Sequence, residues 1–232
     1  MLVLGIETSN VILSVAIVED NQTLIEITEH SKNNHSERLM PVIEKAFKEI
    51  NRKIKEIDLI AVSEGPGSYT GVRIGVTVAK TLAWTLDKPL VGLSSLEILA
   101  KNLDKDGIVI PLFDARRQTA FAGAYKNGQS IIPDGHYVLD SFLNQLSEID
   151  ENLYFVGEDV DNFWEIITEV LPFKTQKIED PQQNIPHAAT LAKLAIQKKP
   201  IPNIHNFTPK YHRLPEAEVN WLASLKENSN VN

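Results

Sequence analysis

The most constraining feature of this chain is the segment 63–84, SEGPGSYTGVRIGVTVAKTLAW, where a glycine-rich turn leads directly into a helical pattern with almost no charge. Small residues recur there at every fourth position and therefore share one helix face: Gly71, Gly75, Ala79 and Ala83. Apolar side chains cover much of the remaining circumference. Such a helix is buried on several sides, so one sheet face alone does not cover it.

The glycine turn matches neither of the common phosphate-binding motifs. A Walker-type loop requires Lys and then Ser or Thr directly after its last glycine, whereas Gly71 is followed by valine and arginine. The dinucleotide motif has two residues in its second gap, and the gap between Gly67 and Gly71 holds three. Weak anion binding at the helix N-terminus stays open as an alternative. We favour a tight turn in which Pro66 fixes φ and the glycines permit positive φ.

The first half of the chain has the pattern of a mixed α/β unit. Three strands joined by hairpins are indicated by runs of branched residues at 2–6, 12–18 and 23–28. The segment 37–50 has helical spacing and follows a potential capping pair, Asn34 and Glu37. A strand at 57–62 precedes the quoted segment, and a strand and a third helix lie within 88–103. This order implies a sheet with parallel crossovers covered by helices.

The second half repeats part of this pattern. Its expected strands and helices lie at 108–113, 119–125, 153–156, 161–170 and 187–198. Glu7 and Asp114 each end an apolar strand, and a glutamine follows each of them fifteen residues later, as Gln22 and Gln129. Two short hairpins often coincide in this way. The spacing therefore leaves internal duplication and coincidence equally open.

The helix at 37–50 also carries surplus apolar surface. At 100° per residue its apolar side chains span an arc of roughly 160°, made by Leu39, Met40, Val42, Ile43, Ala46, Phe47 and Ile50. Composition favours the second half of the same chain as the cover for the surplus apolar surface of these two neighbouring helices. The alternative is a protein interface, which an exposed apolar patch of this kind otherwise marks.

Charge and composition exclude several classes of protein. The net charge of -8 argues against a protein that binds nucleic acid unaided, since phosphate binding requires clustered Lys and Arg. The absence of cysteine excludes disulfides and thiolate chemistry, and it suits a cytoplasmic location. The opening MLVLGIE lacks the basic start of a signal peptide. Arg73 and Lys80 interrupt the longest weakly charged run, so we predict no membrane span.

Catalytic motifs are sparse. The closest histidine pair, His30 and His35, does not have the H-x-x-x-H spacing of helical zinc sites. Ser94 and Ser95 open a helix, where hydroxyl groups usually cap. The best polar candidates stand at strand ends, with structural ion pairing as the favoured interpretation: Glu7, Asp114, Arg116 and Arg117. A small basic cluster that could meet a phosphate, or form a solvated patch, contains Lys210, His212 and Arg213.

Several stretches together resemble one protein family. They are GIETS at 5–9, HSERLMPVIEKAF at 35–47, GPGSYTGVRIGVTVAKTLAW followed by KPLVGLSSLEILA, DARRQTAFAGAY at 114–125 and PKYHRLPEAE at 209–218. Over most of its length the chain is similar to the TsaB family, also called YeaZ. The resemblance implies an α/β fold of the actin-like, Hsp70-like ATPase (ASKHA) type with two duplicated lobes and mixed five-stranded sheets. It implies lobes at 1–105 and 106–225 and a frayed tail at 226–232.

The resemblance also implies a function. Members of the family help to make threonylcarbamoyladenosine next to the anticodon of tRNAs that read codons beginning with A. They support a catalytic sibling, TsaD, whose metal-binding H-x-x-x-H follows the strand that corresponds to 89–94. Ser95 and Leu99 stand at the matching positions here and cannot replace two imidazoles. The resemblance thus implies a noncatalytic, dimerising subunit without metal or cofactor. The rival hypothesis is an enzyme, either a sugar-kinase-like phosphotransferase or a metallopeptidase.

In that family the first two helices pair with those of a second subunit, either TsaD or another copy of the same protein. Carried onto this chain, the interface is expected at Leu39, Ile43, Ala46, Phe47, Gly71, Gly75, Val78, Ala79 and Leu82. The ATPase TsaE is expected as a further partner, and tRNA only through the complex. Whether the isolated chain is a monomer or a homodimer stays open. The candidates for a nucleotide or phosphate contact are Thr8, Ser9 and Arg116.

Overall fold

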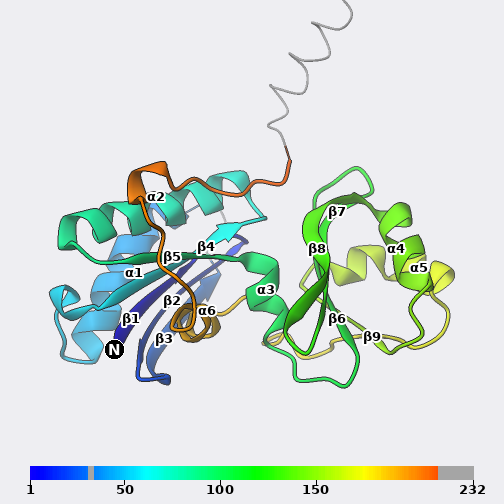
Figure 1. Ribbon diagram of the computed structural model, residues 1–232, viewed down its shortest axis with the longest axis horizontal. Coiled ribbons are helices and arrows are strands. Elements are labelled where there is room, and N and C mark those ends of the chain that lie inside the picture. The colour runs from blue at the N-terminus through cyan, green and yellow to red at the C-terminus, as the bar shows by residue number, and fades with distance from the viewer. Residues whose placement is uncertain (31–33, 214–232) are drawn as a thin grey trace, which may run out of the picture.

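The computed structural model describes residues 1–30 and 34–213, which form two lobes side by side, each around a five-stranded sheet (Figure 1). The first sheet has the order β3-β2-β1-β4-β5, in which β1 and β2 pair antiparallel, as do β2 and β3, while β4 lies parallel to β1 and β5. Its strands are β1 (Leu2–Glu7), β2 (Ile12–Glu19), β3 (Gln22–His30), β4 (Leu59–Gly65) and β5 (Leu90–Ser94).

The second sheet repeats this arrangement with the order β8-β7-β6-β9-β10. Its strands are β6 (Ile108–Asp114), β7 (Thr119–Lys126), β8 (Gln129–Val138), β9 (Leu153–Val156) and β10 (Thr175–Lys177). Pairing again changes from antiparallel to parallel at the first strand of the lobe. Glu7 and Asp114 end equivalent strands, and Gln22 and Gln129 begin equivalent strands. The shared topology confirms the internal duplication that the glutamine spacing had left open.

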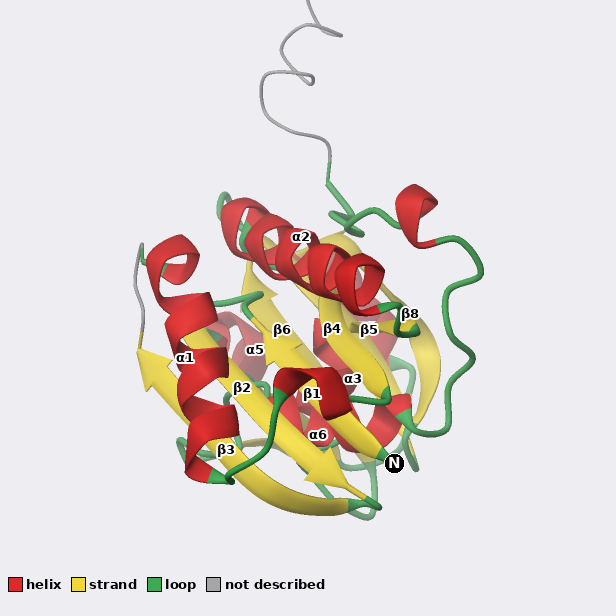
Figure 2. Ribbon diagram, turned by 90° about the vertical axis from the view of Figure 1, so that its left-hand side faces the viewer, coloured by secondary structure: helices red, strands yellow, loops and turns green. Residues whose placement is uncertain are grey.

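Helices cover both faces of the first sheet (Figure 2). Alternate strand residues point to opposite faces, and one face packs against α1 (His35–Glu49) and α2 (Tyr69–Leu86). The other face packs against α6 (Ala188–Ala195). A short 3-10 helix, η1 (Ile54–Glu56), joins α1 to β4. The two-sided burial explains why β1, β2 and β4 read as nearly continuous apolar runs.

The second sheet has its own core. On one face it packs against α4 (Leu139–Ser147), η2 (Val160–Phe163) and α5 (Trp164–Val170). Its other face packs against α3 (Ser95–Ala100), which follows β5 and lies between the lobes (Figure 1). The predicted caps are only partly confirmed, because Ser94 Oγ accepts the N–H groups of Leu96 and Glu97 whereas the Asn34 side chain makes no capping bond.

The last described part of the chain returns to the first lobe. The segment 199–213, here called the C-terminal strap, contains η3 (Ile204–Asn206) and runs along β5 and α2. Ile201 N donates to Leu90 O at 2.8 Å, Phe207 is buried in the first core, and Lys80 Nζ donates to Phe207 O at 2.6 Å. A division after residue 105 therefore separates α6 and the strap from the sheet that they pack against. The predicted tail, 226–232, lies outside the described residues.

Some elements were not predicted from sequence. β8 contains Pro133 and Gly135, which break the alternation of a strand and suit its place at a sheet edge. α4 is short and begins directly where β8 ends, without a side-chain cap. None of the helices in the described ranges is long and apolar enough to cross a membrane.

Candidate protein-interaction surface

The small-residue stripe of α2 faces the chain's own sheet. A Cβ built on Gly71 would stand 2.2 Å from Thr8 O, and one built on Gly75 would stand 2.2 Å from Thr8 Oγ1. Thr8 Oγ1 also donates to Gly71 O at 2.8 Å. Ala79 and Ala83 continue the same buried face. The stripe therefore allows α2 to approach the end of β1 closely, which is a function within the monomer.

Most of the predicted interface residues are likewise buried by contacts within the monomer. Seven of the nine are buried in the first core or against β1: Leu39, Ile43, Ala46, Phe47, Gly71, Gly75 and Ala79. Val78 and Leu82 are half-buried and reach the surface beside α1. The sequence pattern correctly indicated that α2 is buried on more than one side, but β1, β4 and α1 cover most of this buried surface. The prediction of a partner contact remains for Val78 and Leu82.

The outer face of α2 forms a different, weakly charged surface. A groove of about 410 Å³ runs between α1 and α2, and we call it the α1–α2 groove. Its lining is Ser36, Tyr69, Thr70, Arg73, Ile74, Thr77 and Val78, of which only Arg73 is charged. Three large side chains of the two helices are exposed: Met40 by 44%, Tyr69 by 44% and Trp84 by 68%. An exposed apolar surface with a polar rim has the composition of a protein interface.

The end of β1 holds a buried polar turn. Ser9 N donates to Glu7 Oε1 at 2.5 Å, and Glu7, Thr8 and Ser9 are all fully buried. Glu7 Oε2 and Ser9 Oγ make no hydrogen bond within residues 1–30 and 34–213. Burial raises the pKa of Glu7 despite the hydrogen bond from Ser9 N. Thr8 and Ser9 are thus enclosed, and their proposed phosphate contact stays a prediction.

The third candidate for a phosphate contact, Arg116, lies on the other lobe. It occupies the turn after β6, where its N–H donates to Asp114 Oδ1 at 2.6 Å. This contact repeats the one between Ser9 and Glu7 at the equivalent strand end, as the duplication requires. The Arg116 residue is exposed, whereas its counterpart is buried. The structure therefore does not bring Arg116 into one contact group with Thr8 and Ser9.

The positions that correspond to the sibling's metal ligands are used for packing. Ser95 Oγ lies 2.8 Å from Ser63 Oγ, and Leu99 is buried in the core between α3 and the second sheet. Neither residue type fits a metal that needs imidazole ligands. Over the described ranges, no three His, Asp or Glu side chains are grouped in a way that suits a metal ion.

A partly buried hydrogen bond connects the end of β5 to the second lobe. Asp134 of β8 accepts hydrogen bonds from Ser94 Oγ, at the end of β5, and from Tyr125 OH, the latter at 2.6 Å. Burial raises the pKa of Asp134 against the effect of these donors, and burial together with the Asp134 charge raises the pKa of Tyr125. Across the same junction, His30 Nε2 lies 3.7 Å from Glu158 Oε1.

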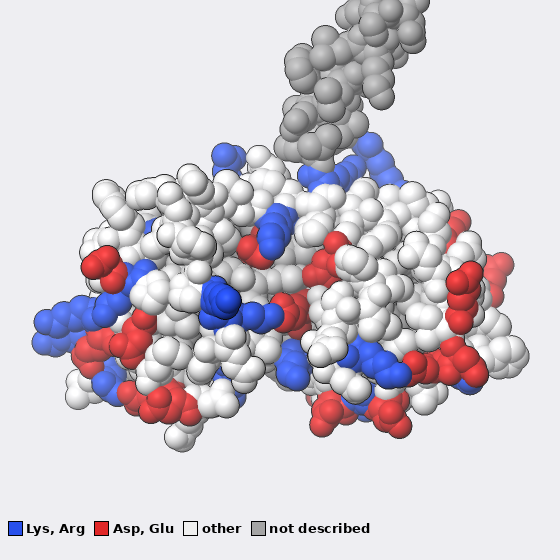
Figure 3. Space-filling view, viewed as in Figure 1, with Lys and Arg blue, Asp and Glu red and all other residues white. Residues whose placement is uncertain are grey.

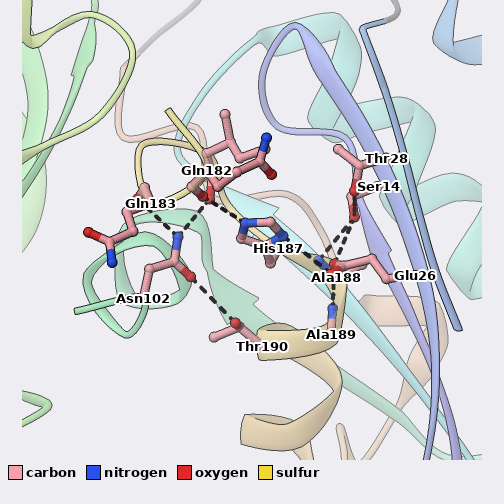
Figure 4. Close-up of polar contacts among 11 residues, drawn as sticks. Ser14, Glu26, Thr28, Asn102, Gln182, Gln183, His187, Ala188, Ala189 and Thr190 are labelled. Carbon is pink, nitrogen blue, oxygen red and sulfur yellow. Dashed lines mark hydrogen bonds and ion pairs between the residues drawn. The ribbon is translucent and has the colours of Figure 1, made fainter. Parts of the chain in front are cut away.

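A second polar network anchors α6 to the first sheet (Figure 4). Glu26 Oε1 accepts from Ala189 N at 2.9 Å and from Ser14 Oγ at 3.1 Å, and His187 Nδ1 lies 3.3 Å from Glu26 Oε2. Burial alone would raise the pKa of Glu26, but hydrogen bonds from His187, Ala189 and Ser14 outweigh it and lower the pKa. The hydrogen bond to Glu26 raises the pKa of His187. Sequence reasoning missed this network because its members come from distant segments.

Asn102 extends the network to the two segments that cross between the lobes. Its Nδ2 donates to Gln183 O at 3.1 Å and to Ile185 O at 2.7 Å, and Thr190 Oγ1 donates to its Oδ1 at 3.4 Å (Figure 4). One side chain thus ties the connection after α3 to the connection before α6. No local pattern in the sequence marks Asn102 for this role.

The sequence of the chain is similar to known proteins over both lobes. The family model of TsaD, described as tRNA N6-adenosine threonylcarbamoyltransferase, matches residues 22–221. The tRNA threonylcarbamoyladenosine biosynthesis protein TsaB of Bacillus subtilis (strain 168) is 40% identical over 231 residues, which cover 97% of this chain and 100% of that protein. The match thus extends over both lobes.

Solved structures show the same fold. YeaZ from Pseudomonas aeruginosa superposes with a TM-score of 0.71 at 23% identity, covering 90% of this chain and 99% of that one. A ROK hexokinase from Thermus thermophilus reaches a TM-score of 0.51 at 10% identity, covering 85% and 99%. The predicted actin-like fold with two mixed five-stranded sheets is therefore confirmed. With the full-length match to the Bacillus protein, these findings show that the chain belongs to the TsaB (YeaZ) family of tRNA threonylcarbamoyladenosine biosynthesis proteins.

Proposed function

We propose that this chain is a noncatalytic subunit that binds TsaD and supports the threonylcarbamoylation of tRNA by that partner. The α1–α2 groove is the observation that carries the proposal. It presents the exposed Tyr69 and the half-buried Ile74 and Val78 in a hollow whose lining has a single charge. Partner surfaces of this kind lose little polar hydration on binding, so their apolar contacts contribute directly to affinity.

The noncatalytic role has separate support. Ser95 and Leu99 replace the two histidines of the catalytic sibling and are both enclosed by neighbouring side chains. At the end of β1, Glu7, Thr8 and Ser9 are fully buried and Glu7 Oε1 accepts the N–H of Ser9, so this turn is closed to a phosphate group. These substitutions favour a scaffold over the rival phosphotransferase or metallopeptidase.

The proposal extends to further partners on the resemblance alone. TsaE is the expected ATPase partner, a second copy of the chain is the alternative occupant of the groove when TsaD is absent, and the work takes place in the cytoplasm. The chain meets tRNA as part of the assembled complex, because its net charge of -8 opposes binding of RNA by the chain alone.

Reconstitution tests this function directly. Threonylcarbamoylated tRNA is measured in a mixture of the adenylate-forming enzyme, TsaD, TsaE and this chain, with each protein omitted in turn. We expect product only when TsaD and this chain are both present. Equal product without this chain would refute the supporting role. Stoichiometric binding of ATP to the isolated chain, measured in parallel by calorimetry, would instead favour the phosphotransferase.

A further inference from the structure

The C-terminal strap forms a charged surface where it reaches the second lobe. Arg213 Nη1 donates to Ala115 O at 2.7 Å, and this contact brings the end of the strap against the turn that follows β6. The basic cluster noted in the sequence thereby joins two further arginines. We call the combined surface the basic edge, and its residues are Arg116, Arg117, Lys210, His212 and Arg213.

The turn holds its arginines in an unusual backbone conformation. Arg116, Arg117 and Gln118 have φ values of 65°, 53° and 57°, in the left-handed region that side chains other than Gly, Asn and Asp adopt at a cost. The turn is fixed by Thr119 N and Thr119 Oγ1, which donate to Arg116 O at 3.0 and 2.8 Å. Both arginine residues are exposed. Long cationic side chains at strained, exposed positions are typical of a contact site rather than of packing.

Charge is locally positive there although the chain as a whole is acidic. Figure 3 shows basic side chains along the upper edge of the molecule, whereas acidic and basic side chains are interspersed over the rest of this face. Lys210 Nζ lies 2.6 Å from Glu64 Oε1, and Asp114 Oδ1 accepts the backbone N–H of Arg116. Asp134 accepts hydrogen bonds from Ser94 and Tyr125.

The basic edge continues the α1–α2 groove. The ring of Tyr211, within the strap, stacks on the ring of Tyr69 with centroids 4.5 Å apart, and Tyr69 lines the groove. A partner seated in the groove would therefore stand beside the cations. Aromatic faces next to cationic side chains suit the bases and phosphates of RNA better than the carboxylates of an acidic protein.

We propose that the basic edge contacts the phosphate backbone of the tRNA substrate in the assembled complex with TsaD. This inference rests on the proposed function, because the partner supplies most of the RNA affinity and the edge adds to it. Each arginine that neutralises a phosphate releases a counterion, so the contacts weaken steeply with salt and carry little sequence preference.

The test measures tRNA binding by the complex over a range of salt concentrations, using fluorescence anisotropy with labelled tRNA. The variant is Arg116→Asn with Arg117→Asn, since asparagine tolerates the left-handed conformation. The matched control removes two exposed lysines elsewhere, Lys55→Gln with Lys199→Gln. We expect tRNA affinity to be about three- to tenfold weaker for each lost contact. The slope of the logarithm of the binding constant against the logarithm of the salt concentration is expected to be smaller by about one for each lost contact. The control is expected to match wild type.

The outcomes separate this inference from the proposed function. Thermal unfolding and co-elution with TsaD are measured for every variant, and Arg213→Gln supplies an independent single change if the double variant does not fold. Unchanged affinity and salt slope in a variant that still binds TsaD would overturn the RNA contact and leave the proposed function intact. A variant that binds TsaD more weakly would show that the edge contacts protein. Failure of the wild-type chain to bind TsaD would refute the proposed function itself.

Discussion

Thr8 and Gly75 approach so closely that a Cβ on Gly75 would stand 2.2 Å from Thr8 Oγ1. The contact joins the end of β1 to the buried face of α2, and Thr8 is itself fixed by the hydrogen bond from Oγ1 to Gly71 O at 2.8 Å. The glycine thus sets the distance between helix and sheet in the first lobe. The surface that we propose for the partner, on the opposite side of α2, depends on this placement.

Gly75→Ala is expected to destabilise the chain by about 1–3 kcal/mol, although alanine is the better helix former, because overpacking at a buried contact outweighs helix propensity. Urea unfolding measures the loss. Thr8→Ala in the same chain should recover part of it by removing Oγ1, whereas Thr8→Val keeps a branch there and should not. Equal stability of Gly75→Ala and wild type would show that α2 can move away from β1 without cost.

The small-residue stripe also shows what the sequence could and could not predict. Periodicity correctly located α2 and predicted close packing on one face, because spacing along a helix is a local property. It did not identify the neighbour, since the contacts of Gly71 and Gly75 with Thr8 join positions more than sixty residues apart. The exposed groove was found only once the buried side of α2 was known. The His187 network and the hydrogen bonds of Asn102 leave no local pattern at all.

The His187–Glu26 pair predicts a pH dependence of stability. Glu26 has a lowered pKa, so its contribution is present above its usual value of 4.5 and is lost as the pH falls through the lower folded value. His187 has a raised pKa, so its contribution is present below its usual value of 6.5 and is lost as the pH rises through the higher folded value. The two contributions coexist between pH 4.5 and 6.5.

The measurement compares the free energy of unfolding of wild type and His187→Gln from pH 4 to pH 9. We expect the difference to be greatest between pH 4.5 and 6.5 and to shrink above the raised pKa of His187. His30→Gln is the control, because His30 is more exposed and lies farther from its carboxylate, Glu158. A pH-independent difference for His187→Gln would contradict the assignment of an ion pair.

Ser94 combines two roles at the junction of the lobes, since its Oγ caps α3 and also donates to Asp134. Ser94→Ala is expected to cost about 2 kcal/mol of stability, about half from the cap and half from the hydrogen bond. Tyr125→Phe removes only a hydrogen bond to Asp134, so about 1 kcal/mol is expected. Chemical denaturation measures both. A larger loss of stability for Tyr125→Phe than for Ser94→Ala would contradict the two roles of Ser94.

We propose that the outer face of α2 binds TsaD, and a single substitution in the groove can test this binding. Thr77 is exposed and lines the groove, so Thr77→Arg places an unpaired charge there without entering the core. Thr168→Arg is the matched control on an exposed helix position in the second lobe. Calorimetric titration of TsaD with each chain should show affinity at least about tenfold weaker for Thr77→Arg, because desolvating an unpaired charge is costly. The control should bind as wild type does. Equal affinity for Thr77→Arg and wild type would contradict the assignment of this face to the partner.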